Sequence, residues 1–306
     1  MNVVGIDVGG TSIKIGVVNQ KGRILKKVSV AINPKEPGLT ALSRLAKTIN
    51  SFKKTYHVKG VGIGVPGILD LSRGEVLFSS TTLNSWHSIN IVKTLTNLTH
   101  LKVVLNNDAN VATLAEAHFG KYKNKETLIL LTLGTGVGGG IISRRKLFMG
   151  NKGQGAELGH ISIDIHGRRC GCGRHGCLEA YASATALIND TKKILKKYPN
   201  SLLKNKKLNG KIIWDAYRKK DLAASIVIRN YIYYLGEGIL NYCIIFRPDV
   251  ILLTGGIANA GNLLLKPLRE YVKKNHDGIS GTAPVLLDFA SLKYDSGIIG
   301  AASLVL

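Results

Sequence analysis

The sequence lacks long apolar runs, and this absence excludes a membrane-spanning segment. Its apolar stretches are short, such as Leu128 to Leu131 or Val250 to Leu253, whereas a transmembrane helix needs about 20 apolar residues. The N-terminus enters a strand-like pattern by Val3, without the basic and then apolar layout of a signal peptide. We therefore expect a cytoplasmic protein with no membrane partner.

Cysteine is also scarce, with four in 306 residues. Three of the four fall between positions 170 and 177. In a cytoplasmic protein such a cluster favours a metal site over a disulfide framework. The fourth, Cys243, lies in an apolar segment with helical spacing, and we expect it in the core.

Acidic residues are few: 19 Asp and Glu stand against 42 Lys and Arg, for a formal net charge of +23. A strongly basic chain invites the hypothesis of nucleic-acid binding. The basic residues are scattered in pairs, such as Lys192-Lys193 and Lys196-Lys197, without a helix-turn-helix or RNA-binding signature. We expect no specific nucleic-acid partner, but a solvated basic surface that helps attract anionic nucleotides.

The chain is long for one core, so two domains are expected. Strand-like and helix-like segments are mixed along it, which predicts an α/β fold. The expected elements of the second half are helices over 179–197 and about 223–246, a buried strand over 250–254, a helix to about Lys274 and a closing helix over 297–306.

Glycine is abundant, and it forms two similar strand-turn-strand segments, VVGIDVGG-TSIKIGVVN and LILLTLGTGVGGG-IIS, 125 positions apart. Gly-rich turns aim backbone N–H groups at one point, as phosphate binding requires. Neither segment is a Walker A loop, because no Gly-Lys-Ser/Thr ending occurs. The candidate phosphate-binding residues are Asp7, Gly9, Gly10, Thr11 and Lys14, then Gly134, Thr135 and Gly136, and Gly255-Gly256 after the strand over 250–254. Asp7 could act on Mg²⁺ through water.

Asn106-Asn107-Asp108 ends a predicted strand and opens a helix expected from Asp108 to Phe119, with Gly120 at its end. Two interpretations of Asp108 remain open at this point. It caps the helix N-terminus, or it is a general base that takes a proton from a hydroxyl attacking phosphorus, and the two roles do not exclude each other.

His160, Cys170, Cys172 and Cys177 form an H-x9-C-x-C-x4-C array. Three thiolates and one imidazole suit tetrahedral Zn²⁺ in a closed structural site. His175 is an alternative fourth ligand, and buried or redox-active cysteines are the competing interpretation.

Several of these segments together resemble the ROK family of bacterial sugar kinases and sugar-responsive repressors, especially its glucokinase-like members. The shared motifs are DVGGTSIK, GIGVPG, NNDAN, TLGTGVGGG, GAELGH and CGCGRHGCLEA, with LLTGGI later in the chain. The resemblance implies an actin-like (ribonuclease H-like) ATPase fold, with two α/β domains around a central cleft. We expect one domain from 1–108 with about 293–306, and the other from 109–292 with a zinc loop at 160–177.

The resemblance also implies transfer of the γ-phosphate of MgATP to the 6-hydroxyl of glucose, with Asp108 as the base. Sugar hydroxyls are then bound by Gly67, Thr82, Asn107, Asp108, Glu157, His160 and Glu179. Many relatives carry Asn where this chain has Thr82, which leaves other hexoses open: fructose, mannose, N-acetylmannosamine or N-acetylglucosamine. Polyphosphate is the alternative donor.

A sugar-binding transcriptional regulator of the same family is the other class of function. Family repressors carry an N-terminal DNA-binding extension, whereas this chain begins directly with the Asp7 strand, and we expect the kinase. The resemblance to this family also implies a homodimer or a higher homo-oligomer.

Overall fold

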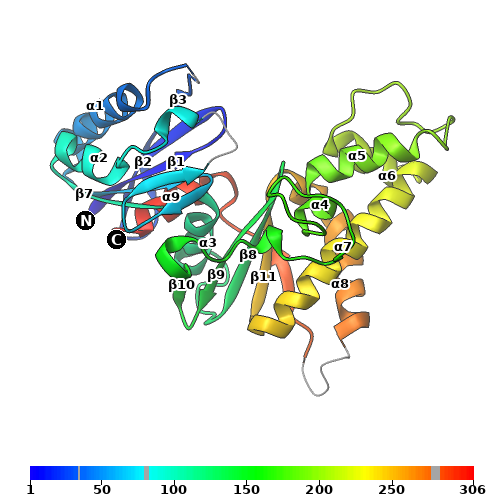
Figure 1. Ribbon diagram of the computed structural model, residues 1–306. Helices are drawn as coiled ribbons and strands as arrows, with labels where there is room; N and C mark the ends of the chain where they lie inside the picture. Colours follow the sequence, from blue (N-terminus) through cyan, green and yellow to red (C-terminus); the bar gives the residue numbers. More distant parts are fainter. Residues whose placement is uncertain (34, 79–82, 277–282) are drawn as a thin grey trace. The chain divides into compact units, whose positions relative to one another are not determined.

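A computed structural model of the chain describes residues 1–306 except 34, 79–82 and 277–282. The chain divides into two compact units (Figure 1). The first contains residues 1–126, 140–156 and 291–306, and the second contains 127–139 and 157–290. These ranges differ from the expected division at residue 108. The helix that follows, α3 (Asp108–Phe119), packs along the C-terminal helix α9 (Ser296–Ser303) and so stays in the first unit.

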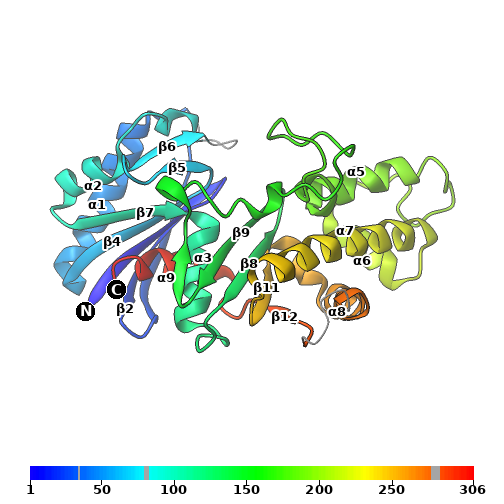
Figure 2. The ribbon, with the colours of Figure 1, turned by 60° about the horizontal axis from the view of Figure 1, so that its bottom comes forward.

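The first unit contains a five-stranded sheet in the order β3-β2-β1-β4-β7. Strands β1 to β3 form an antiparallel meander, and β4 and β7 continue the sheet in parallel. Helices α1 and α2 cover one face, and α3 and α9 lie on the other (Figure 2). The bounds are β1 Asn2–Val8, β2 Ser12–Asn19, β3 Ile24–Ala31, α1 Gly38–Tyr56, β4 Val58–Val65, α2 Ile91–Thr99 and β7 Lys102–Asn107, with a small hairpin of β5 (Ile68–Asp70) and β6 (Glu75–Phe78).

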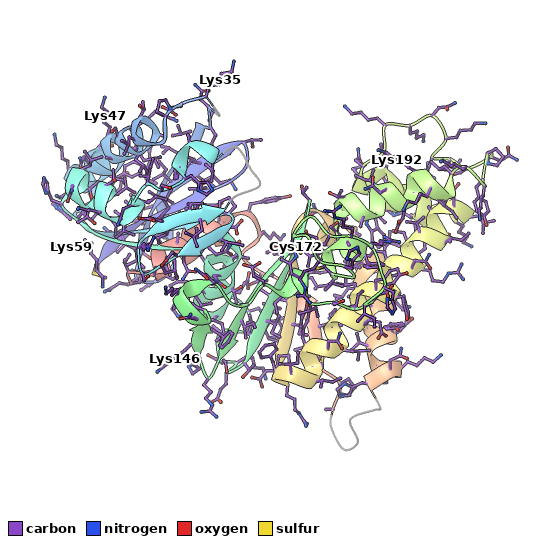
Figure 3. All side chains as sticks on the ribbon, in the orientation of Figure 1. Lys35, Lys47, Lys59, Lys146, Cys172 and Lys192 are labelled. Atoms are coloured by element: carbon purple, nitrogen blue, oxygen red, sulfur yellow. The ribbon has the colours of Figure 1, made fainter. Side chains whose placement is uncertain are left out.

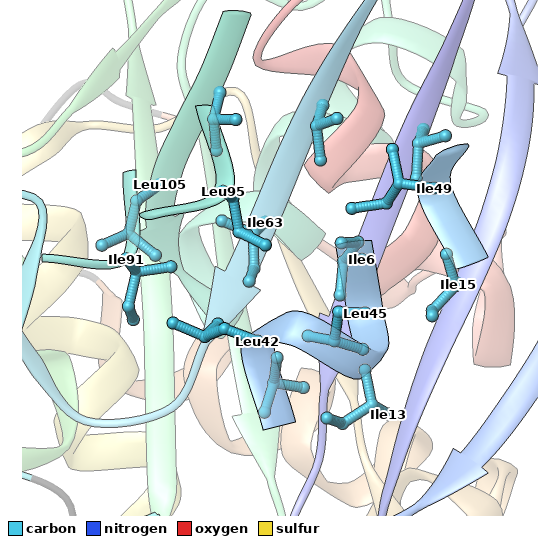
Figure 4. Close-up of a cluster of buried hydrophobic side chains, with 14 of the residues drawn as sticks. Ile6, Ile13, Ile15, Leu42, Leu45, Ile49, Ile63, Ile91, Leu95 and Leu105 are labelled. Carbon is cyan, nitrogen blue, oxygen red and sulfur yellow. The ribbon is translucent and has the colours of Figure 1, made fainter. Parts of the chain in front are cut away.

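The core of this unit follows the two-residue period of its strands. Ile6 of β1 and its neighbours on the same face pack with Leu42, Leu45 and Ile49 of α1 in one large cluster (Figure 4). Val3, on the opposite face of β1, joins a smaller cluster with residues of α9. The sheet is therefore apolar on both faces and needs a helical layer on each side.

A second sheet has the order β10-β9-β8-β11-β12. It repeats the first, since β8 and β9 form a hairpin where β1 and β2 do, and β11 and β12 run parallel to β8. The two similar segments seen in the sequence thus open two sheets of one topology. The bounds are β8 Leu128–Leu133, β9 Val137–Ser143, β10 Lys146–Phe148, β11 Val250–Thr254 and β12 Leu286–Phe289.

Besides strands of this sheet, the second unit contains helices and the irregular segment between His160 and Glu179. Its helices are α4 (Glu179–Ala182), α5 (Ala184–Ile194), α6 (Gly210–Arg218), α7 (Leu222–Phe246) and α8 (Asn262–Asn275). The single helix expected over 179–197 is wrong, because Ser183 adopts an extended backbone and its side chain caps α5 by accepting the Ala186 N–H. Cys243 is buried on α7, as expected. No helix among the described residues is long and apolar enough to cross a membrane.

Basic side chains are spread over the described surface. Figure 3 labels five lysines on separate segments, Lys35, Lys47, Lys59, Lys146 and Lys192, and all five are exposed. This spread agrees with the scattered pairs in the sequence.

At two positions the helix α9 approaches the first sheet closely enough to exclude any side chain. A Cβ at Gly5 of β1 would overlap the Ile298 carbonyl oxygen, and a Cβ at Gly62 of β4 would overlap that of Ala301. Glycine is required at both positions because the obstacle is helix backbone, which cannot rotate away as a side chain can.

Substitution Gly62→Ala is expected to lower the free energy of unfolding by about 3 kcal/mol, since α9 must shift to admit the methyl group. Gly60→Ala is the matched control on the same face of β4, where the nearest atom is a Val305 side-chain carbon at 3.4 Å. Urea unfolding of both variants measures the difference. Equal losses at the two positions would contradict this account of the packing.

Candidate active site

The first group of candidate residues lies where β7 ends and α3 begins. The Asn107 side-chain oxygen accepts hydrogen bonds from the N–H groups of Ala109, at 2.8 Å, and Asn110, at 3.3 Å. Asn107 is therefore the N-cap of α3, and the capping interpretation of Asp108 is wrong. Asp108 is the first helical residue and is half-buried, with its Oδ1 accepting the Ala109 N–H at 2.8 Å.

The other end of the Asn107 amide holds the loop after β4. Its Nδ2 donates to the carbonyl oxygen of Gly67 at 3.0 Å, where Gly67 has a φ of +109°. The structure thus joins three of the predicted sugar-binding residues, Gly67, Asn107 and Asp108, at one edge of the first sheet. Thr82 lies outside the described residues.

The sequence motif contained a further residue whose role was missed. Asn106 is buried, and its oxygen accepts the Asn107 N–H at 2.8 Å and the Asn110 side-chain amide at 3.1 Å. A polar side chain at the buried end of a parallel strand is the signal that could have identified it, because such a group must find partners.

The first Gly-rich turn brings Asp7 and Lys14 together as partners across β1 and β2. The Lys14 Nζ lies 3.4 Å from the Asp7 carboxylate. Burial raises the pKa of Asp7, while Lys14 acts in the opposite direction. The turn is closed by a hydrogen bond from the Gly9 N–H to the Ser12 carbonyl at 3.0 Å, and the space beside Gly10, next to the exposed Thr11, is open.

The second Gly-rich turn lies beside the loop after β11, within the second unit. A Cβ at Gly255 would meet the backbone of Leu133, and its φ is +92°, so glycine is required there. The positions next to Gly134 and Gly256 are open, and Thr135 is exposed. The predicted phosphate-binding glycines 134–136 and 255–256 are therefore neighbours, as a single phosphate site needs.

The remaining predicted sugar-binding residues gather in the second unit. His160 ends a short 3-10 helix (Leu158–His160), and its N–H donates to the Glu157 carbonyl at 3.0 Å. Although Glu157 is exposed, desolvation of its carboxyl raises its pKa, His160 opposes this rise and Glu179 adds to it. The effects of His160 and Glu179 on the Glu157 carboxyl indicate that the three side chains lie near one another.

His160 and three cysteines converge on one point. Their four potential ligand atoms, from His160, Cys170, Cys172 and Cys177, all lie within 4.8 Å of one another. The Cys172 and Cys177 sulfurs are 3.6 Å apart, and the Cys170 sulfur is 3.7 Å from His160 Nδ1. A tetrahedral site with Zn–S bonds of ~2.3 Å places two sulfurs roughly 3.8 Å apart. The donor set therefore fits zinc, and His175 is not part of it.

Two of these thiols are buried. Burial raises the pKa of Cys170 and raises that of Cys177 to about 12. Such thiols stay protonated at neutral pH unless a cation displaces the protons, so metal binding here must release them.

The metal-binding loop is anchored to the helices that follow it. The Arg168 guanidinium lies over the Tyr181 ring, 4.4 Å from its centroid, and pairs with Asp190 at 2.9 Å. It also donates to the Ala180 carbonyl at 3.1 Å. The cation–π contact, combined with directed hydrogen bonds, fixes the loop on α4 and α5.

Two sheets of one topology, each opened by a glycine-rich hairpin, define an α/β protein with the actin-like ATPase fold. The chain belongs to the ROK family, whose family model matches residues 3–306.

Individual relatives agree with this assignment. The glucokinase of Thermotoga maritima is 37% identical over 314 residues, covering 100% of this chain and 97% of that protein. The crystal structure of a ROK family glucokinase from Streptomyces griseus in complex with glucose and AMPPNP is 34% identical, with a TM-score of 0.82 and 99% of each chain covered. The xylose repressor of Bacillus subtilis is 29% identical and covers 99% of this chain and 76% of the repressor.

Substitution Asn107→Ala is expected to lower the free energy of unfolding by about 2 kcal/mol, because it removes the α3 cap and the bond to Gly67. Asn90→Ala is the matched control: Asn90 caps α2 through one hydrogen bond, to the Lys93 N–H at 2.7 Å, and should cost about 1 kcal/mol or less. Thermal unfolding compares the two. A loss at Asn107 no larger than the loss at Asn90 would show that the bond to Gly67 adds nothing.

Proposed function

We propose that this protein is an ATP-dependent glucokinase that transfers the γ-phosphate of MgATP to the 6-hydroxyl of glucose. The observation that carries the proposal is the full-length similarity to a glucokinase solved with glucose and AMPPNP. The grouped candidate residues described above support it. We also propose a cytoplasmic location, as for an enzyme that uses cellular ATP.

Asp108 is the proposed general base. Asp108 is the residue directly after the N-cap Asn107, so the capping bonds fix the position of the backbone that carries the Asp108 carboxylate. It takes the proton of the 6-hydroxyl as the oxygen attacks the γ-phosphorus, and the leaving group is ADP. Phosphoryl transfer depends mainly on positioning and charge stabilisation, which the backbone N–H groups of the two Gly-rich turns and Lys14 supply. Asp7 would hold Mg²⁺ through water, and the ion would help neutralise the charge on the phosphates.

Sugar hydroxyls are proposed to bind Gly67, Thr82, Asn107, Glu157, His160 and Glu179. His160, Cys170, Cys172 and Cys177 would hold Zn²⁺, which would supply fixed geometry rather than chemistry. Because Nδ1 of His160 faces the Cys170 sulfur, Nε2 is the nitrogen left to bond a hydroxyl. A bound metal would thereby set the orientation of the His160 side chain, which is proposed to bind sugar.

Substitution Asp108→Asn is expected to lower kcat by about 10²- to 10⁴-fold, since an amide cannot accept the hydroxyl proton. The fold should remain, because the α3 cap belongs to Asn107. ADP release with glucose, fructose, mannose and N-acetylhexosamines measures activity, and thermal unfolding checks the fold. Polyphosphate in place of ATP tests the other donor.

Three results would oppose this assignment. Wild-type protein without turnover on any hexose would refute the kinase. Full activity of Asp108→Asn would refute the base. Specific, sugar-sensitive DNA binding without turnover would instead support a regulator like the xylose repressor.

Purified protein is expected to contain zinc near one equivalent per chain. Cys172→Ser should lose the metal and raise KM for glucose by about 10-fold or more, because His160 loses its fixed orientation. Cys243→Ala is the control, since it removes the thiol outside the cluster and should keep the zinc. Elemental analysis and steady-state kinetics measure both. A metal-free wild-type protein with full activity would exclude the positioning role.

A further inference from the structure

The segment from Leu178 to Thr185, here called the linking segment, makes three hydrogen bonds to the Gly-rich turn at 134–137. The Glu179 Oε2 accepts the Val137 N–H at 2.9 Å. The Ala184 N–H donates to the Gly134 carbonyl at 2.8 Å. The Thr185 hydroxyl donates to the Thr135 carbonyl at 2.8 Å. All of these residues belong to the second unit.

The same segment is fixed to the metal-binding loop. The Leu178 N–H donates to the Ile161 carbonyl at 2.9 Å, and the other Glu179 oxygen, Oε1, lies 3.7 Å from the Cys170 sulfur. The buried Tyr231 of α7 donates to the Ala182 carbonyl at 2.7 Å. The linking segment is thus bonded to the core through Tyr231, and it connects the Gly-rich turn at 134–137 with the metal-binding loop.

The contact with Glu179 also explains Gly136. A Cβ on Gly136 would overlap the Glu179 carboxylate. At Gly134, by contrast, the corresponding space is open. Gly136 is therefore needed so that Glu179 can reach the Val137 N–H, whereas Gly134 is the position that leaves the backbone accessible to a phosphate.

We infer that Thr185 is a positioning residue which, together with Glu179, holds the turn at 134–137 in its phosphate-binding form and ties it to the metal-binding loop. This inference rests on the proposed kinase function. Two carbonyl groups and one N–H of the turn are engaged by the linking segment, so its peptide planes are fixed before nucleotide arrives. Preorganised backbone donors lose little entropy on binding, which favours the bound state.

Thr185→Val tests the inference, because valine keeps the branched shape and removes only the hydroxyl donor. Thr185 is exposed, so the variant should fold. We expect the Kd for AMPPNP and KM for ATP to rise roughly 3- to 10-fold, the value of one hydrogen bond. Thr185→Ser, which retains the hydroxyl, should restore both values. Zinc content, the melting temperature and the Kd for glucose should stay as in wild type.

The outcomes separate the two proposals. If wild type binds AMPPNP but phosphorylates no sugar, the kinase proposal fails. The effect of Thr185→Val on AMPPNP binding then still tests whether Thr185 positions the turn at 134–137. If wild type is active and Thr185→Val binds AMPPNP as wild type does, the positioning role is overturned. If Thr185→Val weakens glucose binding as much as nucleotide binding and also lowers the melting temperature, the role of Thr185 is merely structural. That result would also overturn the positioning role.

Discussion

The packing of α9 on the first sheet and on α3 is the contact on which the position of Asp108 depends. Glycines at 5 and 62 let the helix reach the sheet, and a Cβ at Gly300 would overlap the Val111 carbonyl of α3. The last helix of the chain thus fixes α3 against the first strands. The buried Glu116 of α3 adds to this contact by accepting the Leu292 N–H at 2.6 Å. Asp108, the proposed base, opens α3 and so inherits the rigidity of this backbone packing.

In the second unit a single carboxylate, that of Glu179, has a comparable role in positioning the loops around it. Glu179 contacts the Gly-rich turn through one oxygen and the metal-binding loop through the other. A residue proposed to bind sugar therefore also shapes the turn proposed to bind phosphate. Positioning of both ligands by one fixed group is a physical route by which the binding of one can favour the other.

Much of the fold was readable from local patterns. The helix over 108–119, the strand over 250–254 and the two similar hairpins follow from apolar periodicity and glycine placement, and the structure confirms each. Patterning did not reveal the break at Ser183, because a serine inside an apolar-periodic stretch is compatible with a helix. The Ser183 side chain caps α5, and the next two residues, Ala184 and Thr185, bond to the turn at 134–135, which is distant in sequence.

The sequence alone determined the chemistry available: three thiols and a histidine at metal-binding spacing, two Gly-rich turns, and Asn107-Asp108 at a strand end. Tertiary structure decided how these groups are used. In the folded chain Asn107, and not Asp108, is the N-cap of α3. Nδ1 of His160 faces the Cys170 sulfur, and Gly136 lies directly against the Glu179 carboxylate. Residue type and spacing fix which atoms can donate, accept or ligate. Which atom faces which partner depends on backbone packing between segments far apart in the chain, and local sequence does not encode it.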